Sequence, residues 1–88
     1  MRILQIIDSL EAGGAERMAV NYANALAQKI DFSGIVISRK EGALLNQISS
    51  NVSYLFLNKK SALDIQSVFK LRKFVIQNAV EIVHAHST

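Results

Sequence analysis

Four short apolar runs, separated by segments with helical spacing, constrain the fold of this 88-residue chain more than any other feature. The runs cover residues 3–7, 32–38, 52–57 and 80–85. The first, Ile3-Leu4-Gln5-Ile6-Ile7, is nearly continuous rather than alternating, which is typical of a parallel strand covered on both faces. Strands that alternate with helices predict a parallel sheet with right-handed crossovers.

Three helical segments are expected between these runs. The first extends from Ala15 to about Lys29, and the second is a short piece at about 43–49. The third covers about 63–78, with Ser61 as its expected N-cap and an apolar surface broad enough to contact the sheet and a second partner. The apolar face of the first helix is expected to contain Ala15, Met18, Ala19, Tyr22, Ala23 and Leu26.

The resulting element order, βαβαβαβ, predicts an α/β fold with a Rossmann-like parallel sheet of strand order 3-2-1-4. In that order the first and fourth strands are neighbours at the point where the strand order reverses. Ligands of open α/β sheets bind at this point, beyond the carboxyl ends of the strands. We therefore look for functional residues directly after the first and fourth runs.

A pair of glycines, Gly13 and Gly14, follows the first strand and precedes the first helix. Glycine permits positive φ and lets a ligand approach the backbone, and a helix N-terminus attracts anions such as phosphate. An ordinary tight turn is an equally valid interpretation of the pair alone. Neither the G-x-G-x-x-G dinucleotide pattern nor the G-K-[ST] mononucleotide pattern is present.

The fourth strand ends in a second polar motif, His84-Ala85-His86. Histidines two residues apart project from the same side of a strand, so both are predicted to face the crevice near the glycine turn. A contact with a bound substrate and a structural role both fit this pair. No metal site is expected, because two ligands are too few and Asp8 is the nearest carboxylate in the predicted topology.

Composition excludes several classes of protein. The chain has no cysteine, so disulfides and thiolate metal sites are excluded, and no apolar run approaches the length of a membrane-spanning helix. The net charge is +3, and half of the ten basic residues occur in two groups. These groups predict a solvated face or a patch that faces anionic lipid or a nucleotide. Binding of nucleic acid is not expected, because the aromatic residues are not interleaved with the basic residues on any predicted strand. The two groups contain Lys59, Lys60, Lys70, Arg72 and Lys73.

The segments GGAERMAVNYANAL and VEIVHAHS resemble the beginning of a GT-B fold glycosyltransferase of the retaining family numbered four. The resemblance covers almost the whole chain. Such enzymes transfer a sugar from a nucleotide-sugar donor to a glycan or lipid-linked acceptor, for example in polysaccharide biosynthesis. By this resemblance Gly13 and Gly14 approach the donor diphosphate, and His86 contacts the donor sugar as the catalytic candidate. His84 is a second donor-binding candidate.

The resemblance also implies that residues 1–88 are an incomplete, acceptor-side N-terminal domain. The C-terminal domain, which holds most of the nucleotide in this family, would be absent, so we expect the chain alone to be inactive. We expect no cofactor besides the donor, no nucleic-acid partner, pairing of copies through an open sheet edge or apolar helix, and a cytoplasmic location with peripheral contact at the inner face of the membrane. Two alternatives remain: a nucleotide-cofactor Rossmann domain, with Arg39 and Lys40 near a 2′-phosphate, and a non-catalytic α/β association module.

Overall fold

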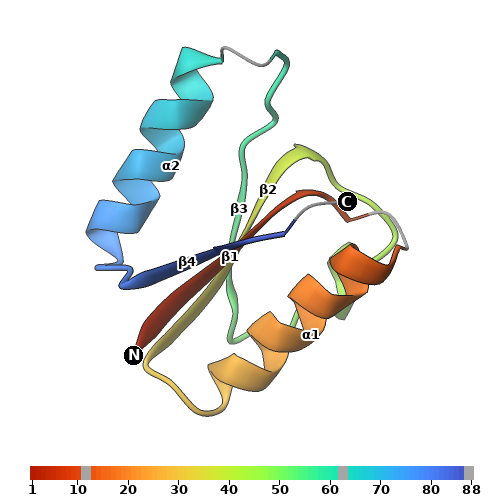
Figure 1. Cartoon of the computed structure of the whole chain (residues 1–88), viewed down its shortest axis with the longest axis vertical. Coiled ribbons are helices and arrows are strands. Elements are labelled where there is room, and N and C mark those ends of the chain that lie inside the picture. Colours follow the sequence, from red (N-terminus) through yellow and green to blue (C-terminus); the bar gives the residue numbers. More distant parts are fainter. Residues whose placement is uncertain (11–12, 62–63, 87–88) are drawn as a thin grey trace.

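The computed structural model describes residues 1–10, 13–61 and 64–86. They form one four-stranded parallel sheet in the order β3-β2-β1-β4, with one long helix on each face (Figure 1). The expected α/β class and the strand order 3-2-1-4 are therefore confirmed. The elements are β1 (Arg2–Ser9), α1 (Gly14–Ala27), β2 (Phe32–Lys40), the 3-10 helix η1 (Leu45–Gln47), β3 (Ser53–Phe56), α2 (Ile65–Gln77) and β4 (Ile82–Ala85).

The strands differ in length, and this difference shapes the edge of the sheet where a ligand is expected. Strand β1 pairs with β2 along most of its length, whereas β4 pairs only with Ile3 to Ile6 of β1. Strand β1 then continues for three residues beyond that level, to Ser9. At about 3.3 Å per residue, β4 stops about 10 Å before the end of β1.

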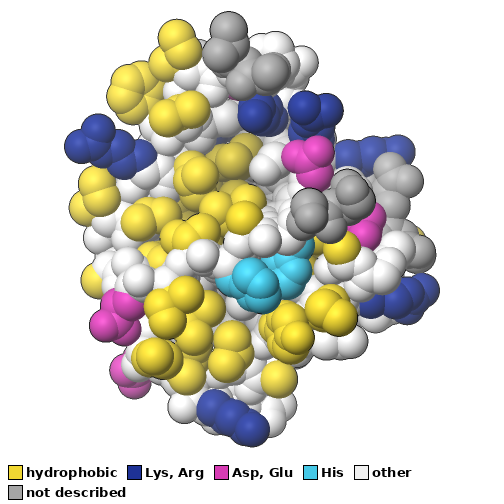
Figure 2. Space-filling model, viewed as in Figure 1, with side chains coloured by type: hydrophobic (Ala, Val, Ile, Leu, Met, Phe, Trp, Pro, Cys, Tyr) yellow, Lys and Arg dark blue, Asp and Glu magenta, His cyan; other side chains and the backbone are white. Residues whose placement is uncertain are grey.

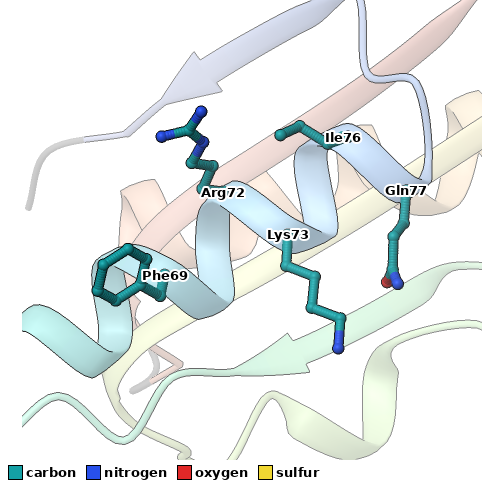
Figure 3. Close-up of a pocket in the computed structure, with 5 residues that line it drawn as sticks. All are labelled: Phe69, Arg72, Lys73, Ile76 and Gln77. Carbon is teal, nitrogen blue, oxygen red and sulfur yellow. The ribbon is translucent and has the colours of Figure 1, made fainter.

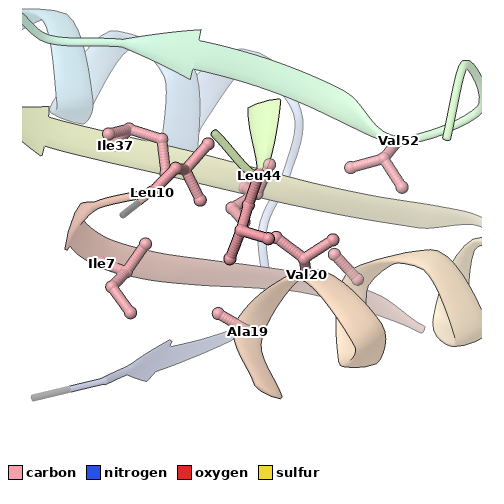
Figure 4. Packing of buried hydrophobic residues seen from close by; sticks show 9 residues of the cluster. Ile7, Leu10, Ala19, Val20, Ile37, Leu44 and Val52 are labelled. Atoms are coloured by element: carbon pink, nitrogen blue, oxygen red, sulfur yellow. The ribbon is translucent and has the colours of Figure 1, made fainter. Parts of the chain in front are cut away.

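The larger core lies between the sheet and α1 (Figure 4). Small side chains, Ala19 and Ala23, let the helix approach the sheet closely, and Ile35 and Ile37 of β2 fill the space opposite them. The hydroxyl of Ser33 on β2 donates a hydrogen bond of 2.7 Å to the carbonyl oxygen of Ala23, which ties the helix to the strand. The buried members of this core are Ile7, Leu10, Ala19, Val20, Ala23, Ile35, Ile37, Leu44 and Val52.

A smaller core lies between the sheet and α2. Its buried side chains are Leu4, Val36 and Leu57, and α2 covers them with side chains that stay partly exposed. The Asp64 side chain caps α2 by accepting a hydrogen bond of 3.1 Å from the backbone N–H of Ser67. Neither helix in the described part of the chain is long and apolar enough to cross a bilayer.

Three local expectations need correction. The N-cap of α2 is Asp64 and not Ser61, because only Asp64 reaches an N–H of the first turn; the expected first residue, Leu63, lies outside the described residues. The short helix expected at 43–49 is reduced to the single turn η1. On α1, Met18 and Tyr22 are exposed and Val20 is buried instead, because the helix meets the sheet with its Ala19, Val20 and Ala23 face.

Candidate functional site

The glycine pair lies at the start of α1, as predicted, and both residues have an ordinary backbone conformation. Gly13 is the N-cap residue with φ −114° and ψ 175°, and Gly14 is the first helical residue. No glycine in the described ranges has a positive φ. A left-handed backbone, which glycine would permit, therefore explains neither Gly13 nor Gly14.

The two glycines differ in the space around them. A Cβ atom built on Gly13 would lie 2.6 Å from Oε1 of Glu16, so a side chain there would displace that carboxylate. A Cβ atom on Gly14 would meet nothing within 4 Å. A side chain at position 13 would therefore require only the end of the Glu16 side chain to move, and the fold places no steric demand on position 14.

Glu16 lies at the third position of α1, and its side chain is only 8% exposed. Its carboxylate is close to Gly13, at the end of the helix where the free N–H groups and the positive end of the dipole favour negative charge. Arg17, the next residue, is exposed as expected. A phosphate that approaches this helix end would meet the Glu16 carboxylate, which therefore has to be counted as part of the site.

The two histidines lie on the α1 side of the sheet at β4. His84 is opposite Gln5 of β1 in the strand register, and the backbone N–H of His86 donates a 2.9 Å hydrogen bond to the carbonyl oxygen of Ile6. The two imidazole rings have centroids 4.1 Å apart, and the ring of Tyr22 from α1 lies 6.0 and 6.2 Å from them. Figure 2 shows the histidines at the surface, surrounded by hydrophobic side chains.

Gln5 holds the ring of His86. Its side-chain oxygen is 2.6 Å from Nε2 of His86, and Gln5 itself is only 1% exposed. With the Gln5 amide in this orientation, Nε2–H donates and the neutral ring keeps Nδ1 as a hydrogen-bond acceptor. Burial lowers the pKa of His86 below its ordinary value, and the neighbouring His84 lowers it further. The neutral form, which presents Nδ1 to a donor such as a hydroxyl group, is thus favoured.

The glycine turn and the histidines belong to the same edge region of the sheet but to different levels of it. Both follow neighbouring parallel strands, β1 and β4. The histidines, however, contact α1 at Tyr22, and the helix rises about 12 Å from Gly14 to that residue. A ligand that touches both motifs must therefore be extended, and a single phosphate group is too short.

Two residues of this cluster, Gln5 and Tyr22, were not predicted as site residues. Gln5 carried a signal, because it is the one polar side chain in the Ile3–Ile7 run of a strand covered on both faces. Tyr22 was assigned to the buried face of its helix, and its aromatic ring instead lies 44% exposed beside the histidines.

The other polar groups at this edge do not form a metal site. Asp8, near the end of β1, forms an exposed ion pair of 3.6 Å with Arg39 of β2. In the ranges that the structure describes, no group of three or more histidine, aspartate or glutamate side chains could hold a metal ion. The arrangement suits hydrogen bonding to a polar organic ligand better than metal coordination.

Comparisons with protein-family models, with curated proteins and with solved structures find no match to this chain.

Proposed function

We propose that the chain is the acceptor-side, N-terminal part of a retaining GT-B glycosyltransferase that uses a nucleotide-sugar donor. The observation that supports the proposal is the pairing of β4 with β1, because it brings the Gly13–Gly14 turn and the His84–His86 motif to one edge region of the sheet. This is the region where open α/β sheets bind ligands. The resemblance of both motifs to this family supplies the kind of ligand.

Gly14 contributes the second argument. The fold needs neither a positive φ nor a missing side chain at this position, yet the residue lies at the start of a fourteen-residue helix. A bare backbone at a helix N-terminus lets an anion come within hydrogen-bond distance of the free N–H groups. In the proposed complex the donor diphosphate approaches Gly14, and the Glu16 carboxylate turns away from Gly13 to admit it.

His86 has the complementary role at the sugar end of the donor. Its neutral ring, held through Nε2 by Gln5, offers Nδ1 to a hydroxyl group of the sugar. The rise of about 12 Å along α1 from Gly14 to Tyr22, which lies beside the histidines, suits an elongated ligand such as a diphosphate joined to a sugar. Acceptor binding, most nucleotide contacts and catalysis would need a second domain, so this chain alone should bind donors weakly and transfer nothing.

The proposal is tested by titrating the ¹⁵N-labelled chain with UDP-glucose and GDP-mannose, with free glucose as the control ligand. We expect weak binding, with the largest amide shifts at Gly13, Gly14 and His86. Gly14→Ala should abolish these shifts while the fold stays intact, because the added methyl group meets open space in the free protein. Asn21→Ala, on the exposed face of α1, should leave them unchanged.

Three results would contradict this function. Shifts spread over other parts of the sheet, or none in wild type at saturating donor, would remove the support for a donor site. A reading frame that encodes no second Rossmann-like half after Thr88 would exclude the two-domain enzyme. Saturable micromolar binding of NADPH would favour the nucleotide-cofactor alternative, in which Arg39 would leave Asp8 for the 2′-phosphate.

A further inference from the structure

The two long helices differ at their first turns. In α2 the carboxylate of the N-cap residue Asp64 accepts a hydrogen bond of 3.1 Å from the backbone N–H of Ser67. In α1 the N-cap residue is Gly13, which has no side chain that could do the same. The backbone N–H of Arg17 makes the first helical hydrogen bond, 3.0 Å from the carbonyl oxygen of Gly13. The N–H groups of residues 14–16 therefore have no partner within the helix.

The Glu16 carboxylate lies beside this open helix end. Glu16 is more than nine-tenths buried, and a Cβ atom built on Gly13 would lie 2.6 Å from its Oε1 and 3.1 Å from its Oε2. No hydrogen bond or ion pair joins this carboxylate to any part of the chain that the structure describes. Its oxygens keep contact with solvent, since no buried side-chain oxygen of the described residues lacks a partner. The helix end thus combines unpartnered donors with an unpartnered acceptor, and both are open to a ligand.

We propose that Glu16 is a built-in competitor of the anion that binds at the start of α1. The proposal rests on the donor site of the proposed function, and it gives a cause for weak binding by the chain alone. The carboxylate takes the position that the positive end of the helix dipole favours, without making hydrogen bonds there. A diphosphate makes those hydrogen bonds, but it has to move the carboxylate away or accept its repulsion.

Such a competitor keeps small anions out of the site. The apparent affinity of a site falls in proportion to the fraction of molecules in which the site is open. Free phosphate and pyrophosphate make no contacts beyond the helix end, so they gain little while Glu16 occupies it. A nucleotide-sugar that also contacts His86 and a second domain has further binding energy with which to move the carboxylate. Glu16 therefore leaves the site empty at concentrations of small anions at which a complete donor still binds.

A purely structural role for Glu16 leads to a different expectation. In a capping box, a Glu or Gln at the third helical position accepts a hydrogen bond from the backbone N–H of the N-cap residue. No such hydrogen bond is present in the described part of α1. Glutamine serves a capping box as glutamate does, whereas only glutamate repels an anion. Glu16→Gln therefore separates the two roles.

The test is a titration of the ¹⁵N-labelled chain with sodium pyrophosphate at constant ionic strength, followed at the amides of Gly13 and Gly14. Glu16→Gln should bind pyrophosphate about tenfold more tightly than the wild type, because a like charge beside the anion is removed. Glu16→Ala should show a similar gain, and it provides the same test if the glutamine variant does not fold. Glu16→Asp keeps the charge and should gain little. Circular dichroism verifies that each variant keeps its helices.

Two controls separate this site from overall charge. Asp31→Asn changes the net charge equally, but Asp31 precedes β2 at the opposite edge of the sheet and pairs with the N-terminal amino group, so binding should not change. The amides of Arg72 and Lys73 are an internal reference, because any anion attracted by charge alone should shift them equally in every variant. These two residues line an exposed hollow of about 380 Å³ on α2 together with Phe69, Ile76 and Gln77 (Figure 3).

The outcomes also distinguish this proposal from the proposed function. Equal pyrophosphate binding by the wild type and Glu16→Gln, or an equal gain in Asp31→Asn, would overturn the role of Glu16. Tighter pyrophosphate binding by Glu16→Gln, without any shifts on addition of UDP-glucose, would support the competitor and remove the nucleotide-sugar donor. UDP-glucose binding at Gly13 and Gly14 that Glu16→Gln leaves unchanged would support the donor site and exclude Glu16 as its competitor.

Discussion

The two helices of this protein cover the two faces of one sheet, but they do so in different ways. Helix α1 buries small side chains against the sheet, and the core beneath it contains nine buried residues. Helix α2 contacts a core of three buried residues and leaves most of its own large apolar side chains in solvent. Both helices have a similar length, so the difference lies in which side chains they direct inward.

The two sides of the sheet therefore differ in how much they contribute to stability. The α1 side is closely packed, and the polar cluster of Gln5, His84, His86 and Tyr22 lies on this side of the sheet at β4. The α2 side contributes less burial and presents apolar and cationic groups outward. We therefore expect substitutions in the core beneath α1 to lower stability more than substitutions of the exposed side chains of α2.

The largest expected difference is between two isoleucines. Ile37 in β2 is fully buried beneath α1, whereas Ile76 of α2 is 63% exposed. Ile37→Ala should lower the free energy of unfolding by about 2–5 kcal/mol, and Ile76→Ala should change it by less than about 0.5 kcal/mol. Urea denaturation followed by circular dichroism measures both. Similar losses in the two variants would show that the α2 side is as closely packed as the α1 side.

Two glycines give the next largest contrast. A Cβ atom on Gly34 of β2 would lie 2.9 Å from the Phe32 ring and 3.0 Å from Leu4, whereas one on Gly14 would lie in open space. Gly34→Ala should cost about 1–3 kcal/mol through overpacking. Gly14→Ala should be neutral or stabilising by up to about 1 kcal/mol, because the unfolded chain loses freedom. Thermal unfolding of both variants provides the comparison, and a destabilised Gly14→Ala protein would contradict it.

Two buried serines, one on each side of the sheet, each form one side-chain hydrogen bond, and the strengths of these bonds can be compared. The hydroxyl of Ser33 donates to Ala23 at 2.7 Å and joins β2 to α1, while that of Ser67 in α2 is 3.5 Å from the carbonyl oxygen of Leu57. Ser33→Ala should cost about 1 kcal/mol. Ser67→Ala should cost less, since its hydrogen bond is long and alanine favours the helix. The contrast fails if chemical denaturation gives the larger loss for Ser67→Ala.

The smallest expected effect is the pH dependence of the histidine cluster. Burial lowers the pKa of His86 in the folded protein, so the unfolded chain binds the proton more readily. Stability should therefore be complete above about pH 6.5, the ordinary value for histidine, and decline as the pH falls below it. His86→Gln should remove this decline of stability below about pH 6.5. An unchanged profile in the variant would show that His86 does not carry it.

Gln5→Glu, a substitution in β1, tests the contact between Gln5 and the His86 ring. A carboxylate beside Nε2 favours the charged ring, so the pKa of His86 should rise, and an NMR titration measures the change. Gln5→Leu removes the hydrogen-bond partner and should not raise the pKa. An equal response to both substitutions would mean that Gln5 does not contact the ring in solution.

Much of the fold could be predicted from local patterns. The apolar runs identified four strands, the helical spacing identified both long helices, and the element order implied the sheet order 3-2-1-4. The position of Gly13 and Gly14 at the start of α1 was also predicted. These features depend on periodicity and chain order, which the sequence contains directly.

The tertiary structure alone decided which polar groups meet. Gln5 and His86 are 81 positions apart, and their contact depends on the register of β4 against β1. In the same way, packing against the sheet left Tyr22 beside the histidines and left one apolar face of α2 uncovered. Spacing along a chain shows that a helix has apolar residues on its faces, but only the partner surface determines which face becomes buried.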